Sequence, residues 1–148
     1  MTTDTQPVNP IELYQIHKDK IDVAMPFIET GLTHLRQRGD IDYSGYQLYH
    51  ELTLEAAFLV MVTQKVEGSS APVGFFVYSE ASDHLFIWLA YSMPAQAEII
   101  ELVNEDIEVL AKSKGFNKIK YGTVRRGWEK LASKYGFKFE EARYVKHV

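Results

Sequence analysis

The order of hydrophobic and polar positions predicts a strand and then a helix near the start of the chain. Apolar and polar residues alternate over residues 11–16 (IELYQI), as in a strand with one buried face. Further on, apolar residues recur every three or four positions, as on one face of an amphipathic helix; they are Ile21, Met25, Ile28, Leu32 and Leu35. Pro26 lies inside this pattern, so the helix either kinks there or begins there with proline in its first turn. We expect Gly39 to end it.

Two more helices are predicted from periodicity and end signals. One is expected from residue 44 to about residue 54, with Ser44 as its N-cap. Its predicted buried face consists of Tyr46, Leu48, Tyr49 and Leu52. The other is longer, from about residue 94 to residue 114, with Ser92 as N-cap and Gly115 as the C-terminal stop. Its predicted buried stripe consists of Ile99, Val103, Ile107 and Leu110.

Three strands are predicted between these two helices, over residues 57–66, 73–79 and 84–91. The segment EGSSAP at residues 67–72 has the composition of a hairpin loop. The segment ASD at residues 81–83 makes a tight connection. The third strand, HLFIWLAY, is an almost continuous apolar run, which predicts burial on both of its faces.

The rest of the chain predicts a strand over residues 118–124, a short helix over 126–135 and a last strand over 137–148. The complete order is β-α-α-β-β-β-α-β-α-β. It predicts an α/β (α+β) fold with one mixed central sheet and helices on both faces. We expect the sheet to splay between the strand at 84–91 and the strand at 118–124.

Composition indicates a single globular domain. The chain has 148 residues, of which 46% are hydrophobic and 24% charged. The polar residues 1–10 are expected to form a disordered tail and not a signal peptide, and residues 11–148 to form the domain. There are no cysteines, which excludes disulfides and thiolate chemistry. No apolar run approaches the ~20 residues of a membrane span, so we expect a cytoplasmic protein with no membrane partner.

Charge is divided unevenly along the chain. Residues 112–148 hold 11 Lys or Arg against 3 Asp or Glu, whereas residues 1–111 hold 5 against 17. Such asymmetry is typical of a surface for phosphate or nucleic acid. Alternatively, the two parts neutralise each other when they pack as one domain. The second interpretation is favoured, and nucleic acid is not the expected partner.

Several segments resemble the GNAT (GCN5-related N-acetyltransferase) superfamily. They are VGFFVY at 73–78, AKSKGF at 111–116 and KYGFKF at 134–139, and the order of elements over residues 11–148 also resembles the GNAT order. In addition, HLFIWLAYS at 84–92 and VRRGWEKLASKYGFK at 124–138 resemble GNAT-like proteins encoded by bacteriophages, often near virion genes. The resemblance implies acetyl-CoA as cofactor, bound in a V-shaped opening between the fourth and fifth strands.

The superfamily holds the pyrophosphate of acetyl-CoA on backbone N–H groups at the start of the long helix, in a loop that reads Q/R-x-x-G-x-G/A. An ungapped count places Ala95 on the first position of this loop and Glu98 and Ile100 on its glycines. Glu98 puts a carboxylate beside the pyrophosphate. Alternatively, the acidic residue only stabilises the positive end of the helix dipole, and the helix start binds no phosphate. A gapped alignment leaves the amides of Met93, Ala95 and Gln96 to bind phosphate.

The superfamily also uses a tyrosine, four residues before the terminal Gly-Phe pair, to protonate the departing CoA thiolate. Ala132 occupies this position, and Tyr135 is three residues away. General acid assistance is worth about 10²- to 10⁴-fold. Two hypotheses therefore stay open. The first is an N-acyltransferase with an atypical cofactor loop. The second is a catalytically inactive GNAT-fold protein of phage origin that acts as a binding or virion-associated structural protein.

The first hypothesis assigns roles to several residues. An amine would enter between the second helix and the fourth and fifth strands, and a backbone amide on a bulge between Leu89 and Tyr91 would polarise the thioester carbonyl. Glu51 or His50 would act as a water-mediated base. Arg125 and Arg126 are placed to clamp a phosphate.

The arginine pair has another interpretation, and other sites are not indicated. Arg125 and Arg126 would instead lie at the domain surface and form ion pairs with the acidic half, with Trp128 anchored in the core. The five histidines lack metal-ligand spacing, so no metal site is expected. The partners expected are acyl-CoA and an amine acceptor, or a phage or host protein in the host cytoplasm or the virion. A homodimer stays open.

Overall fold

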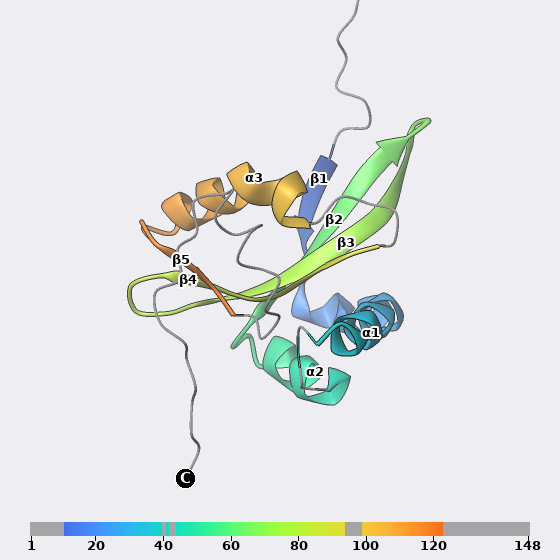
Figure 1. Cartoon of the computed structure of the whole chain (residues 1–148), viewed down its shortest axis with the longest axis horizontal. Helices are drawn as coiled ribbons and strands as arrows, with labels where there is room; N and C mark the ends of the chain where they lie inside the picture. The colour runs from blue at the N-terminus through green and yellow to red at the C-terminus, as the bar shows by residue number, and fades with distance from the viewer. Residues whose placement is uncertain (1–10, 40, 42–43, 94–98, 123–148) are drawn as a thin grey trace, which may run out of the picture.

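Figure 1 shows the computed structural model, which describes residues 11–39, 41, 44–93 and 99–122. Within these ranges the elements follow the predicted order, with an added 3₁₀ turn. They are β1 (Ile11–Gln15), η1 (Lys18–Lys20), α1 (Ile21–Gln37), α2 (Gly45–Thr53), β2 (Phe58–Val66), β3 (Ser69–Glu80), β4 (Leu85–Ser92), α3 (Ile99–Ser113) and β5 (Ile119–Tyr121). The predicted tail at 1–10, helix at 126–135 and strand at 137–148 lie outside the described residues, as does Trp128.

The strands form one mixed sheet in the order β1-β2-β3-β4-β5. The pairs from β1 to β4 are antiparallel, and β4 pairs with β5 in parallel. Helices α1 and α2 lie on one face and α3 on the other (Figure 1). The predicted fold class is therefore confirmed. None of the helices in the described part of the chain is both long and apolar enough to cross a membrane.

The sheet separates two apolar cores. The α1-side core joins α1, α2 and one face of the sheet, and consists of Ile21, Ile28, Leu32, Leu35, Ile41, Leu48, Leu52, Ala57, Leu59, Phe75, Val77, Leu89 and Tyr91. The α3-side core joins α3 to the opposite face, and consists of Val60, Val62, Val73, Phe76, Tyr78, Leu85, Ile87, Val103, Ile107 and Ala111. Most members were expected from the helical and strand periodicities.

Helix α1 runs through its proline. It begins at Ile21, so Pro26 is its sixth residue and the alternative in which the helix begins at Pro26 is wrong. The missing N–H of Pro26 removes one helical hydrogen bond. The burial of Ile28, Leu32 and Leu35 accounts for why the helix tolerates this loss. Gly39 follows the helix with a φ of +81°, as a glycine stop requires.

Helix α2 begins where predicted but buries a smaller face. Ser44 Oγ accepts the N–H of Gln47 at 3.2 Å, and Gln47 Oε1 accepts the N–H of Ser44 at 2.8 Å, which forms a capping box. Leu48 is buried, but Tyr46 is 81% exposed, so its predicted place in the core is wrong. Two positions along a helix correspond to about 200° of rotation. Tyr46 therefore cannot share the face on which Leu48 lies.

The turn between β2 and β3 is shorter than the predicted loop. Only Glu67 and Gly68 form it, with φ values of +52° and +82°, and β3 begins at once at Ser69. Positive φ at both central residues matches the twist of a two-residue hairpin turn. The sequence 69–72 was therefore wrongly predicted as loop. At the other end of the sheet, Gly115 ends α3 with φ +84°, and Phe116 N–H bonds to Ala111 O at 2.9 Å.

Candidate functional site

The described pairing between β4 and β5 is short. It joins Leu85 to Ile119, Phe86 to Lys120 and Ile87 to Tyr121. A last bond runs from Gly122 N–H to Ile87 O at 3.0 Å. Among the described residues no pair extends the ladder beyond Ile87. The last described pair thus lies next to the place where the expected splay would begin.

A β-bulge lies at this same place in β4. Val77 of β3 pairs with Leu89, and the next residue, Tyr78, pairs with Ile87, so Trp88 is an extra residue. The extra residue reverses the faces of the strand. Ile87 belongs to the α3-side core and Leu89 to the α1-side core, although residues two apart normally share a face. Burial of β4 residues on both faces was predicted, but the bulge lies one residue before the predicted 89–91 segment.

The bulge also reverses the direction of the backbone groups. Before it, Leu85 N–H bonds to Lys118 O at 3.0 Å, so odd-numbered residues face β5. After it, Met93 N–H bonds to Val73 O at 2.9 Å, so odd-numbered residues face β3. Alternation then directs the peptide groups of Ala90 and Ser92 toward the β5 side. No described residue pairs with residues 89–92 on that side, and we therefore call this segment the open half of β4.

The side chains of the predicted site residues Leu89 and Tyr91 do not lie at the edge of the sheet that faces β5. Leu89 and Tyr91 are each 2% exposed and pack in the α1-side core. The Tyr91 hydroxyl forms a 3.0 Å hydrogen bond with His34 Nδ1, and burial raises the pKa of Tyr91. Gly31 permits this packing, because a Cβ there would lie 2.8 Å from the Tyr91 ring.

The polar groups available to a ligand at the end of β4 differ from those predicted. The Met93 amide is bonded to Val73 and is therefore not available to a phosphate, contrary to the prediction. The Oγ of Ser92 is buried and has no hydrogen-bond partner among the described residues. Such an orphaned hydroxyl fits a site for a polar ligand. Ala95, Gln96, Arg125 and Arg126 lie outside the described residues.

The two candidate bases lie on α2. His50 is exposed and Glu51 is half-buried. The carbonyl of Glu51 accepts the N–H groups of Ala56 and Ala57, but neither candidate side chain makes a hydrogen bond or ion pair with another described residue. Helix α2 packs mainly on α1 and η1. Nothing in the described contacts brings either base to the open half of β4.

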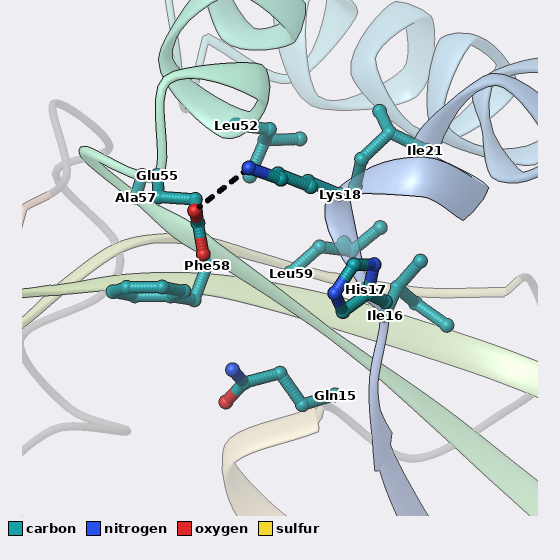
Figure 2. Close-up of a pocket in the computed structure, with 10 residues that line it drawn as sticks. All are labelled: Gln15, Ile16, His17, Lys18, Ile21, Leu52, Glu55, Ala57, Phe58 and Leu59. Atoms are coloured by element: carbon teal, nitrogen blue, oxygen red, sulfur yellow. Dashed lines mark ion pairs between the residues drawn. The ribbon is translucent and has the colours of Figure 1, made fainter.

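A small pocket lies elsewhere. Its volume is about 50 Å³, and it lies between η1, the end of α2 and the start of β2 (Figure 2). Lys18 Nζ and Glu55 Oε1 are 3.4 Å apart across it. None of the described residues that line this pocket belongs to β4. No metal-binding group of three His, Asp or Glu residues occurs in the described ranges.

Sequence reasoning did not name Ser92 as a binding residue but as the N-cap of the next helix, and it included Ala90 only as a member of the predicted bulge segment 89–91. It assigned the cofactor contacts to Leu89 and Tyr91, because it placed the bulge later in the strand. The signal that identifies Ala90 and Ser92 is the pairing of β4 with β3, which is not a local property of the sequence.

Comparisons with known proteins place the fold. No family model and no curated protein matches the sequence. Among solved structures, ribosomal-protein-alanine N-acetyltransferase from Brucella melitensis biovar Abortus 2308 is similar with a TM-score of 0.67 at 14% identity, over 93% of this chain and 99% of that one. AAC(6')-Iy in complex with the bisubstrate analogue CoA-S-monomethyl-acetylneamine is similar with a TM-score of 0.65 at 13% identity, over 94% and 98%.

A GCN5-related N-acetyltransferase from Ralstonia eutropha JMP134 is similar with a TM-score of 0.64 at 14% identity, over 94% of this chain and 99% of that one. Each comparison spans nearly the full length of both chains. Identities this low establish the fold alone. The chain therefore has the GNAT fold of these N-acetyltransferases.

Proposed function

We propose that the protein is an N-acyltransferase that binds acyl-CoA along the open half of β4 and transfers the acyl group to an amine. One observation carries this proposal. The bulge at Trp88 directly follows Ile87, the last residue of β4 in a described pair with β5. The bulge directs the peptide groups of Ala90 and Ser92 toward the β5 side. A ligand with amides of its own can pair with such an edge as an added strand does.

The chain's own groups have distinct roles in this proposal. The coenzyme supplies an acyl group activated as a thioester. The N–H of Ala90 is the first amide after the bulge to face the β5 side, and it polarises the acyl carbonyl. The peptide group and Oγ of Ser92 hold the pantetheine arm. Phosphates would bind to the amides of Ala95 and Gln96 and to the guanidinium groups of Arg125 and Arg126.

The amine acceptor would approach from the face covered by α1 and α2. It must lose a proton before it attacks the acyl carbon; the C–S bond of the thioester would then break, and CoA would leave as its thiolate. His50 or Glu51 would take that proton through a water molecule. Both residues lie on α2, so the proposal requires that the acceptor reaches this helix.

A second candidate function rests on the sequence of the cofactor loop. The segment SMPAQAEIIE contains no glycine, and Glu98 places a negative charge where a pyrophosphate would bind. This favours a domain that has lost catalysis and binds another protein. A phage or host protein as the partner, and the virion as its location, follow from the phage resemblance alone.

Calorimetric and thermal titration with acetyl-CoA separates the two functions. A ligand at about 100 times its Kd stabilises a protein by ~2.7 kcal/mol, which raises Tm by several degrees for a domain of this size. Glu98→Gly should strengthen binding, and Arg126→Ala should weaken it by about 1.5 to 3 kcal/mol. If neither the natural protein nor Glu98→Gly binds millimolar acetyl-CoA, the acyltransferase proposal fails and the binding function is favoured.

A further inference from the structure

The extra residue of β4 is tied to the neighbouring strand by its side chain. Trp88 Nε1 donates to Ser79 Oγ of β3 at 2.8 Å. Ser79 pairs with Phe86, two residues before Trp88, so this bond reaches back across the bulge. The indole is half-buried and packs against the α1-side core.

An aromatic contact also holds the bulge, on the side of β5. The rings of Phe86 and Trp88 meet edge to face with centroids 6.5 Å apart. Phe86 also lies over Gly122, where an added Cβ would be 2.7 Å from the ring. The bulge is therefore held on one side by Ser79 and on the other by a ring that lies over Gly122, the residue directly after β5.

We infer that Trp88 is a positioning residue: its hydrogen bond to Ser79 fixes the bulge and so fixes the direction of the Ala90 and Ser92 peptide groups. A bulge inserts one extra residue and can shift along a strand unless something holds it. Because residues 85–91 are all apolar, their burial alone selects the position weakly. The expected effect of the Trp88–Ser79 bond on acyl-CoA binding rests on the proposed function. Its expected effect on the position of the bulge does not.

Two substitutions remove the bond, and the second does so with little change in volume. Trp88→Phe keeps an aromatic ring and loses the N–H donor, and Ser79→Ala removes the acceptor. The first measurement is hydrogen exchange of the Leu89 and Tyr91 amides, which alternation directs to β3. We expect both variants to exchange these amides about fivefold faster, as loss of a typical hydrogen bond would cause. The double variant should exchange no faster than either single variant, because both remove the same bond.

The second measurement is the Kd of CoA by calorimetry. Each variant should weaken binding about fivefold, since a misdirected Ala90 amide costs one hydrogen bond to the ligand. Thr63→Val is the matched control. It removes a side-chain hydrogen bond, to Glu12 O at 3.4 Å, next to the other register shift of the sheet, between β2 and β3. It should leave both the β4 exchange rates and the Kd unchanged.

The outcomes are decisive for the inference. Unchanged exchange at Leu89 and Tyr91 in both variants would overturn it, and so would faster exchange with an unchanged CoA affinity in a protein that binds CoA. If the natural protein binds no CoA, the proposed function fails by itself. The exchange rates of the two variants then still decide whether the Ser79–Trp88 bond fixes the bulge.

Discussion

Before Trp88, β4 has a strand on each side; after it, the described pairing continues only with β3. The two halves have similar apolar sequences, but Leu85 and Ile87 face the α3-side core whereas Leu89 and Tyr91 face the α1-side core. Among the described residues, only the second half has backbone groups directed toward a side of β4 where no pair is formed. The chemistry that we propose thus depends on which strand neighbours the residue, and not on the residue's own side chain.

The other bulge in the sheet shows why the neighbour matters. Val73 of β3 is also an extra residue, because Val62 pairs with Gly74 and Thr63 with Pro72. It also changes the face of its strand. However, β2 and β4 both flank it, and its carbonyl accepts the N–H of Met93. The same distortion is therefore paired on both sides there, whereas the bulge at Trp88 is followed by residues that have a described partner strand on one side only.

Deletion of Trp88 should cause the largest loss of stability, because it removes the register shift that distinguishes the two halves of β4. Without the extra residue, Leu89 and Tyr91 would turn to the opposite face of the sheet. Removing two large buried side chains from the core costs more than about 4 kcal/mol, so we expect the domain to unfold or nearly so. Urea denaturation followed by circular dichroism measures this. Trp88→Ala keeps the strand length, so it is the control and should reduce stability less. Equal losses of stability in the two variants would contradict the idea that the register places Leu89 and Tyr91 in the core.

Gly31→Val should disturb the packing of α1 against Phe75 of β3 and Tyr91 in the open half of β4. A Cβ at Gly31 would lie 2.6 Å from the Phe75 ring and 2.8 Å from the Tyr91 ring, so the added side chain must push both rings away from α1. Overpacking of this kind costs about 1–3 kcal/mol. Thr30→Val places the same side chain at the adjacent exposed position and should change stability by less than about 0.5 kcal/mol. Equal urea midpoints for the two variants would show that α1 does not hold this half of the strand.

Ser92→Ala should separate stability from binding. Because the Ser92 hydroxyl is buried without a partner among the described residues, its removal should raise the free energy of unfolding by up to about 1 kcal/mol. On the proposed function it should also weaken CoA binding about fivefold. In contrast, Ser113→Ala should lower stability, since the Ser113 hydroxyl donates to Leu110 O at 2.7 Å. Tighter CoA binding by Ser92→Ala would contradict the assigned contact.

The smallest effect is expected at the paired half, where charged groups surround the turn before β4. A hydrogen bond from His84 at 2.7 Å, helped by the charge of Lys118, holds the pKa of Asp83 below its ordinary value. A lowered pKa stabilises the folded state above the unfolded value of about 3.9. This stabilisation is lost as the pH falls through the lower folded value. Asp83→Asn should therefore reduce the urea midpoint slightly at pH 7 and not at pH 2, and a difference that grew on acidification would refute the assignment.

The sequence predicted the elements well where one face alone is apolar. The stripe of α1 alternates with polar residues, so only one orientation buries Ile28 and Leu32. The Ser44 cap and the Gly115 stop act through their own backbone neighbours and are local signals. Such features are fixed within a few residues and were predicted correctly.

The bulge could not be predicted in the same way. A one-residue insertion moves polar side chains to the wrong face in an alternating strand, which makes it visible in the pattern. The segment LFIWLAY has no polar residue, so both registers bury the same kind of surface. The place of the bulge depends on contacts such as Ser79 with Trp88. Because the bulge sets which amides face β5, the candidate site could not be assigned residue by residue.

The crossing of β4 from one core to the other has a consequence for cooperativity. Ile87 and Leu89 are only two residues apart, yet each is packed into a different core. Disorder in either core would therefore also disturb a strand that packs in the other core. The helices on opposite faces of the sheet are thereby linked through this covalent segment, and unfolding should proceed as one transition whichever face a probe reports.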